Sequence, residues 1–330
     1  MKVFKKILSI FLRIGISVAL LIFLFYFKKI DARSLLADIK SADKPLLLLA
    51  FFISLFSYIL GFFRWEMLLK AAEIYLPIKR VIISFSSGIF FNLFLPSTIG
   101  GDFARTIDLS KHTKRTKEVV ATVFLDRLSG YVGLAITLLF SLILGWKLIK
   151  NNVAVLMPAA LIILILIILL LALFNKFLYS QINKLLEIPN AGKFRESIKN
   201  LLEEIHYFKG HKKVLFNNLV LSLFIQAIGP LVFYTTALSL GVTKINLLYF
   251  FIFIPIIGAI TLLPISIGGF GVRESTSVLL FATAGITESL AVAMALLNSI
   301  FILIYGAIGG IIYVLTIHHR RIQHHQPSSL

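Results

Sequence analysis

Ionisable side chains inside apolar stretches are the residues of this sequence that could carry chemistry. A charge within a membrane-spanning helix costs about 2.5–3.5 kcal/mol, so such residues are usually functional or closely paired. The planar guanidinium of arginine suits phosphate recognition, while carboxylates can balance the arginines or carry protons. The candidate residues for substrate binding and translocation are Arg64, Asn92, Asp102, Arg105, Asp126, Arg127, Arg273 and Glu274.

Asp126 and Arg127 are neighbours in one apolar run, and neighbouring side chains on a helix do not face each other. We therefore expect each to pair with a residue elsewhere, and the candidate partners are Arg105, Glu274, Asp102 and Arg273. Such pairs predict a polar cluster near the middle of the membrane, where broken helices leave backbone N–H and C=O groups free. Other interpretations are a buried structural network, charges at the level of the lipid headgroups and, for Arg64 with Trp65, an interfacial anchor.

Two apolar runs, 81–95 and 246–263, end abruptly at a proline that is followed by a pair of glycines. Proline interrupts the helical hydrogen bonds, and glycine relaxes the backbone further. The segments 95–105 and 263–273 share six of eleven residues, including Leu-Pro, Ile-Gly-Gly and the final arginine. This match predicts an internal duplication, and broken segments at corresponding places in two halves indicate a transporter site. The predicted hinge residues are Pro96, Gly100, Gly101, Pro264, Gly268, Gly269 and Gly271.

Composition places these segments in a membrane. Hydrophobic residues make up 58% of the 330 residues, and charged residues make up only 15%. Four stretches of at least 25 residues contain no Asp, Glu, Lys or Arg, whereas one membrane crossing needs about 20 apolar residues. The fold class is therefore an all-α polytopic integral membrane protein with about 6–8 transmembrane helices, forming one domain over 1–330. The expected spans are 7–27, 45–63, 119–146, 153–174, 214–240 and 289–317.

The distribution of Lys and Arg favours six full crossings plus two re-entrant segments. With the N-terminus inside, that topology leaves 22 Lys and Arg on the inner side and 9 on the outer side. Basic loops mark the cytoplasmic side, so we expect both termini there and an inverted repeat of halves 45–146 and 214–317. Eight full crossings with the N-terminus outside give 19 inside and 12 outside, which leaves that topology open.

The remaining segments predict surface structure. Residues 175–213 form an expected cytoplasmic amphipathic connector, residues 31–43 a weaker interfacial helix, and residues 318–330 a basic His-rich tail. The net charge of +18 does not indicate nucleic-acid binding, because the basic residues lie mostly in short loops between apolar runs. The histidine spacing predicts no metal site, and without a Walker-type phosphate loop we expect neither a cofactor nor ATP-driven pumping.

The motifs Arg64-Trp65, Asn92 to Ser97, Gly100 to Arg105, Asp126-Arg127 and Pro264 to Glu274 resemble the membrane domain of lysylphosphatidylglycerol synthases. This flippase-like family includes the multiple peptide resistance factor and many stand-alone prokaryotic proteins, and the resemblance spans residues 10–317. It implies a polytopic fold in the cytoplasmic membrane and movement of lipids between leaflets. We expect the chain to lack the aminoacyl-transferring domain of the fused enzymes, and we therefore expect no lysyl-lipid synthesis.

Three functional hypotheses follow from these observations. The first is a translocator of a phosphate-bearing phospholipid or polyprenyl-linked lipid, in which Arg105, Arg127 and Arg273 engage the phosphate. The second is a membrane-embedded transferase that acts on a lipid carrier, for which the loop at 28–44 offers Asp31, Asp38 and Asp43. The third is a non-catalytic membrane partner of a separately encoded lipid or glycan enzyme, bound through the basic 175–213 segment.

Overall fold

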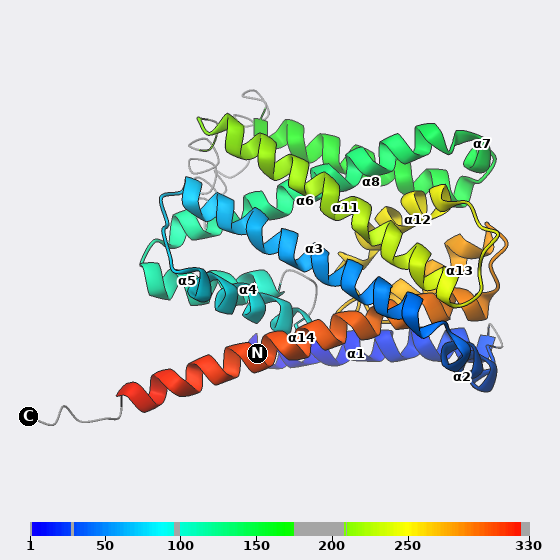
Figure 1. Cartoon of the computed structure of the whole chain (residues 1–330), viewed down its shortest axis with the longest axis horizontal. Coiled ribbons are helices and arrows are strands. Elements are labelled where there is room, and N and C mark those ends of the chain that lie inside the picture. Colours follow the sequence, from blue (N-terminus) through cyan, green and yellow to red (C-terminus); the bar gives the residue numbers. More distant parts are fainter. Residues whose placement is uncertain (1, 28–29, 96–99, 175–207, 209, 325–330) are drawn as a thin grey trace, which may run out of the picture.

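The chain folds into a bundle of helices in the computed structural model, which describes residues 2–27, 30–95, 100–174, 208 and 210–324. Figure 1 shows the long helices running side by side along the bundle. The described helices are α1 (Lys2–Phe27), α2 (Ala32–Ser41), α3 (Lys44–Ala71), α4 (Ile78–Asn92), α5 (Gly100–Thr113), α6 (Thr116–Leu144), α7 (Trp146–Ile149), α8 (Val153–Phe174), α11 (Lys212–Ser239), α12 (Leu247–Thr261), α13 (Val272–Ala282) and α14 (Glu288–His324).

Among the described residues, five helices are long and apolar enough to cross a membrane: α3, α6, α8, α11 and α14. Their mean hydropathy lies between 1.7 and 3.3 over the best window. α1 has a shorter apolar section at Leu12–Tyr26, and α12 is likewise short. The prediction of an all-helical polytopic membrane protein is confirmed, and five of the six expected full crossings meet the length requirement.

α4 and α5 form an antiparallel hairpin, which the cross-contacts between the two helices define. Arg80 is ion-paired with Asp108 at 2.8 Å, and the Ser84 hydroxyl donates to the Arg105 carbonyl at 3.1 Å. Nearer the tip, Gly88 packs directly on Gly101. Since α3 ends and α6 begins at the end of the bundle where this hairpin lies (Figure 1), the hairpin enters the bundle and returns to the same end.

Close packing of this hairpin depends on Gly101. A Cβ atom added there would collide with the Gly88 carbonyl oxygen and lie 2.6 Å from the Asn92 side chain. Gly101→Ala is therefore expected to lower the free energy of unfolding by about 1–3 kcal/mol, the usual cost of overpacking. Unfolding in detergent measures the effect. The matched control is Gly229→Ala in α11, where the nearest atom would be Ile254 Cγ2 at 3.5 Å; an equal change in both variants would contradict the packing argument.

α12 and α13 form the second hairpin, at the opposite end of the bundle (Figure 1). Phe281 of α13 contacts Phe250 and Phe253 of α12, with ring centroids 5.1 and 5.3 Å apart. In the turn between the helices, Gly268, Gly269 and Gly271 have φ angles of 59°, 80° and 82°. This left-handed conformation is disfavoured for residues with a side chain. These three glycines therefore form the backbone break that follows Pro264.

The element order of the two halves corresponds. α3 and α11 each contain 28 residues, and α4 and α12 each contain 15. α3 and α11 pack antiparallel, because the N–H of Asp43 donates to the carbonyl of Ser239 and the Asn218 amide donates to the carbonyl of Arg64. The hairpin tips meet inside the bundle, where Gly268 faces the Leu93 carbonyl oxygen. The two hairpins therefore enter from opposite ends, as an inverted repeat requires.

Several other predictions concern the segments around the repeat. α2 forms at the position of the expected interfacial helix 31–43, and the Asp31 carboxylate caps it by accepting from the N–H groups of Arg33 and Ser34. α14 packs against α4 through small residues, since Gly309 lies against the Ser86 carbonyl oxygen. Pro96, most of the 175–213 connector and the last part of the 318–330 tail lie outside the described residues.

The hairpin topology makes a prediction for cysteine labelling, because the chain has no native cysteine. Lys79 begins α4 and Lys111 lies in the last turn of α5, and both are exposed. Lys79→Cys and Lys111→Cys should react with a membrane-impermeant maleimide from the same side, and Lys147→Cys on α7 from the other. Eight full crossings would place Lys79 and Lys111 on opposite sides, so labelling from opposite sides would contradict the hairpin. The positive-charge bias predicts that the Lys79 side is cytoplasmic.

Candidate functional site

Asp126 of α6 is held between two arginines from different helices. Its Oδ1 accepts from Arg64 Nε at 2.8 Å, and its Oδ2 accepts from Arg105 Nη2 at 2.9 Å. All three side chains are largely buried, with 11% or less of each exposed. A buried carboxylate is tolerated when it is paired and hydrogen-bonded in this way.

Asp102, in the first turn of α5, is the second carboxylate of this charged cluster. It receives two hydrogen bonds from Arg127, at 2.6 Å from Nε and 3.0 Å from Nη2, and an ion pair from Arg105 at 3.0 Å. Arg105 therefore joins the two aspartates. The side chain of Arg127 is 31% exposed, more than any other member of the cluster.

Neighbouring polar and aromatic residues fix the orientation of the arginines. Arg64 donates from Nη1 to the Ser222 hydroxyl of α11 at 3.1 Å. The Arg105 guanidinium lies 4.7 Å from the centre of the Trp65 ring, a cation–π distance. Trp65 is itself fully buried and its indole N–H donates to the Thr122 hydroxyl at 3.3 Å. The interpretation of Arg64 and Trp65 as an interfacial anchor is therefore wrong.

The cluster lines a polar cavity of about 260 Å³ between α3, α4, α5 and α6. Its charged lining consists of three arginines and two aspartates, which leaves one positive charge in excess. The Nε of Arg105 is buried and has no hydrogen-bond acceptor among the described residues. A buried donor of this kind is costly unless a ligand or water accepts from it. The lining residues are Tyr58, Gly61, Arg64, Phe85, Gly88, Ile89, Asn92, Asp102, Arg105, Asp126 and Arg127.

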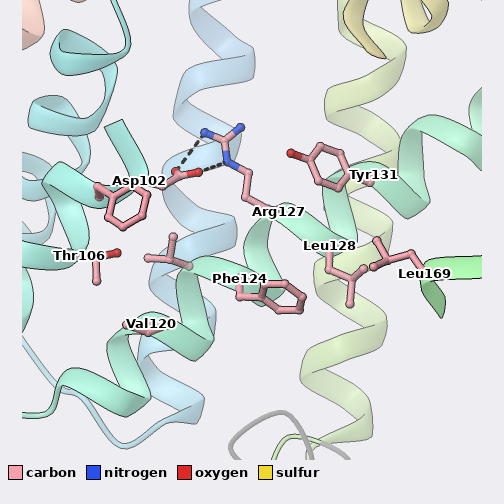
Figure 2. A pocket seen from close by; sticks show the side chains of 10 residues that line it. Asp102, Thr106, Val120, Phe124, Arg127, Leu128, Tyr131 and Leu169 are labelled. Carbon is pink, nitrogen blue, oxygen red and sulfur yellow. Dashed lines mark hydrogen bonds and ion pairs between the residues drawn. The ribbon is translucent and has the colours of Figure 1, made fainter. Parts of the chain in front are cut away.

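An apolar groove of about 330 Å³ adjoins this cavity (Figure 2). Its walls come from α5, α6 and α8, and Asp102 and Arg127 line both the groove and the polar cavity. Figure 2 shows this ion pair at one end of the groove, with Val120, Phe124, Leu128 and Leu169 along its length. The Asp102–Arg127 pair is therefore the boundary between a polar compartment and a hydrophobic one.

The site lies well inside the bundle. Asp126 is ten residues beyond Thr116, where α6 begins, which corresponds to about 15 Å at the helical rise of 1.5 Å per residue. α6 is one of the helices long enough to cross a membrane. Asp126 therefore lies in the interior of α6 and not at its end.

The structure separates the predicted site residues into two groups. Arg64, Asp102, Arg105, Asp126 and Arg127 form the cluster, and the Asn92 amide oxygen accepts from the Gly101 N–H at 2.8 Å beside it. Arg273 and Glu274 lie apart, and neither pairs with Asp126 or Arg127. Their prediction as partners of those two residues is wrong, because α13 belongs to the opposite hairpin. Gly100 and Gly101 also differ from the other predicted hinge residues, since they lie in the first turn of α5 and permit close packing.

Three residues that support the site were not predicted. Asn218 and Ser222 are buried and four residues apart in the charge-free run 214–243, so they share one face of α11. That spacing of polar residues in an apolar helix was a usable signal. Tyr58 lines the cavity two turns before Arg64 on α3. A tyrosine in an apolar run gives no comparable signal.

A bundle of long apolar helices with two opposed hairpins and a buried, charge-lined cavity defines a polytopic membrane protein. The chain belongs to the family described as the lysylphosphatidylglycerol synthase TM region, which matches residues 10–310. It is also 26% identical over 310 residues to a UPF0104 membrane protein of Pyrococcus horikoshii, a similarity that covers 87% of this chain and 91% of that protein. The family resemblance seen in the motifs is thus confirmed.

Proposed function

We propose that the protein translocates a phosphate-bearing lipid between the leaflets of the membrane. The observation that carries the proposal is the meeting of a positively charged buried cavity with an apolar groove at the Asp102–Arg127 pair. A lipid has these same two parts, a polar headgroup and hydrocarbon chains. The headgroup would occupy the cavity while a chain lies in the groove.

The cavity suits a phosphate because of its charge and its partly exposed arginine. Arg64, Arg105 and Arg127 exceed the two aspartates by one charge, and an anionic phosphate would restore neutrality. The Arg127 guanidinium, whose side chain is 31% exposed, offers a phosphate oxygen a charge-assisted hydrogen bond. A volume of about 260 Å³ limits the headgroup to a small one.

The groove suits a hydrocarbon chain because nearly all of its lining is apolar. Phe103, on its α5 side, is 65% exposed on a bundle that crosses the membrane, so the groove is open toward lipid. Burial of apolar surface is favourable by about 25 cal/mol per Å² only where water is displaced. In a membrane the groove therefore selects by shape, and the cavity supplies most of the specificity.

The inverted hairpins supply a route across the membrane. In transporters built from inverted repeats, broken segments meet near the midplane and rock around a central site. Here the tips meet at Leu93 and Gly268, and the cavity opens beside the first hairpin. Asp102 and Asp126 would keep the arginines in place when no lipid is bound.

The transferase hypothesis gains no support from the loop at 28–44. Asp31 and Asp43 cap α2 and α3 through backbone N–H groups, and Asp38 accepts from the Ser289 hydroxyl at 3.1 Å. These contacts are structural. The basic segment 175–213, through which a separately encoded enzyme was expected to bind, lies mostly outside the described residues. Translocation is therefore the function that the geometry favours.

The groove can be tested by filling it. Val120→Trp should lower the rate of leaflet exchange of a fluorescent phospholipid by roughly tenfold in liposomes that contain the purified protein. A loss of about 1.4 kcal/mol in the interaction between the lipid chain and the groove has that effect. Dithionite reduction of the outer-leaflet label measures the rate. The matched control is Leu279→Trp on α13, an apolar position that is 62% exposed and does not line the groove. Equal rates in the two variants would contradict the assignment of the groove.

A further inference from the structure

The second hairpin carries an arginine at the position that corresponds to Arg105. The final arginines of the two matching segments 95–105 and 263–273 are Arg105 and Arg273, and each lies in the second helix of its hairpin, α5 or α13. Both side chains point into the interior of the bundle, as their hydrogen-bond partners show: Asp126 of α6 for Arg105, and Ser299 of α14 for Arg273. α6 and α14 are themselves the corresponding long helices of the two halves.

The surroundings of Arg273 differ from those of Arg105. Arg273 donates from Nη1 to the Ser299 hydroxyl at 2.7 Å and from Nη2 to the Gly268 carbonyl at 3.4 Å, and both acceptors are neutral. Among the described residues no carboxylate lies within ion-pair distance of it. The adjacent Glu274 is fully buried and accepts from the Gly271 N–H and the Ser299 hydroxyl instead. Arg273 is thus a largely enclosed cation that contacts only neutral acceptors, with Glu274 linked to it through the Ser299 hydroxyl.

Tyr58 lines the open cavity and also packs on α14, the helix that carries Ser299. Its side chain lines the cavity together with Arg64 and Arg105, and it also interacts electrostatically with Arg273. On its other side it packs on Tyr305 of α14, with ring centroids 4.7 Å apart. The cavity that contains Arg105 does not include Arg273 in its lining. Tyr58 therefore contacts both the cavity that contains Arg105 and the helix whose Ser299 accepts from Arg273.

We propose that Arg273 forms a second phosphate site, closed in this conformation, which receives the lipid phosphate from the Arg105 cavity past Tyr58. The inference rests on the proposed function and extends it. Because the two hairpins enter from opposite ends, passage from Arg105 to Arg273 carries the phosphate from the site of one repeat to the site of the other. Because no carboxylate of the described residues contacts Arg273 directly, the arriving phosphate can form the ion pair with its guanidinium. Rearrangement of Tyr58 would open the way between the two sites.

The experiment compares binding with movement in Arg273→Gln. Binding is measured with dihexanoyl phosphatidic acid in detergent, using the fluorescence of Trp65 in a Trp146→Phe background, since Trp65 stacks on Arg105 and Trp146 is exposed on α7. Movement is the leaflet exchange of a fluorescent phospholipid in liposomes. Arg273→Gln should bind within about threefold of the wild-type Kd, because the first site is intact, and should exchange lipid no faster than protein-free vesicles. Arg105→Gln should lose both properties.

Two further variants separate a phosphate site from a structural role. Arg273→Lys keeps the charge and should retain part of the exchange, and Ser299→Ala removes the main acceptor of Arg273 and should still exchange lipid. Wild-type exchange by Arg273→Gln, or a loss in Ser299→Ala equal to that in Arg273→Gln, would overturn the second site while leaving the proposed function in place. Absence of exchange by the wild-type protein would overturn the proposed function and this inference together.

Discussion

Asp126→Asn is expected to lower the free energy of unfolding by about 3–5 kcal/mol, the usual cost of removing one partner from a buried ion pair. Asp126 is 5% exposed and accepts hydrogen bonds from both Arg64 and Arg105. Asparagine keeps the shape but removes the negative charge, so that two buried guanidinium groups lose their common counter-ion. Unfolding by denaturant in mixed micelles measures the loss.

Glu118→Gln is the matched control for this prediction, because Glu118 lies on the same helix and pairs with an arginine at the same distance. Arg115 Nε lies 2.9 Å from Glu118 Oε1, and the two side chains are 39% and 25% exposed. Exposed pairs contribute about 0–1 kcal/mol, so this variant should stay close to the wild-type stability. Similar losses in Asp126→Asn and Glu118→Gln would show that the cluster is not the electrostatic core of the bundle.

Arg105→Gln should weaken phosphate binding by about 10- to 100-fold, because hydrogen bonds to charged groups contribute about 1.5–3 kcal/mol. The Arg105 side chain lines the cavity and joins both of its aspartates, so its loss removes one of the three positive charges there. Leaflet exchange should fall in parallel. Both quantities are measured on the purified protein, by titration and in liposomes.

Arg80→Gln distinguishes loss of function from loss of stability. Arg80 is also a buried arginine on the first hairpin, and it pairs with Asp108 at 2.8 Å, but it does not line the cavity. Its replacement should destabilise the bundle while leaving phosphate binding near the wild-type value. Wild-type binding by Arg105→Gln, or an equal loss of binding in both variants, would remove Arg105 from the site.

The sequence predicts much of the fold because a lipid bilayer restricts the backbone conformations that a long apolar segment can adopt. Backbone groups within a bilayer must be satisfied internally, so each long apolar run becomes a helix. The matching segments that end in Arg105 and Arg273 also predicted two broken helices in corresponding places. The end of α3 could be placed only roughly, because the apolar run stops at Phe63 whereas α3 continues to Ala71.

The pairing within the site was harder to predict than its members. Asp126 had Arg105 among its expected partners, and Arg127 had Asp102, and both contacts are present. The contact with Arg64 was not predicted, because 62 residues separate it from Asp126 and only helix packing brings them together. Arg273 was grouped with the cluster because a charge pattern contains no information on which hairpin tip faces which cavity.

The most direct measurement of the central claim compares leaflet exchange of two fluorescent lipids in the same liposomes containing the purified protein. One lipid carries an anionic phosphate headgroup, and the other is a neutral glycolipid with the same chains. We expect the protein to accelerate exchange of the phospholipid well above the rate in protein-free vesicles and to leave the glycolipid near that rate, because the cavity has an excess positive charge. Equal acceleration of both lipids, or of neither, would contradict a phosphate-recognising translocator.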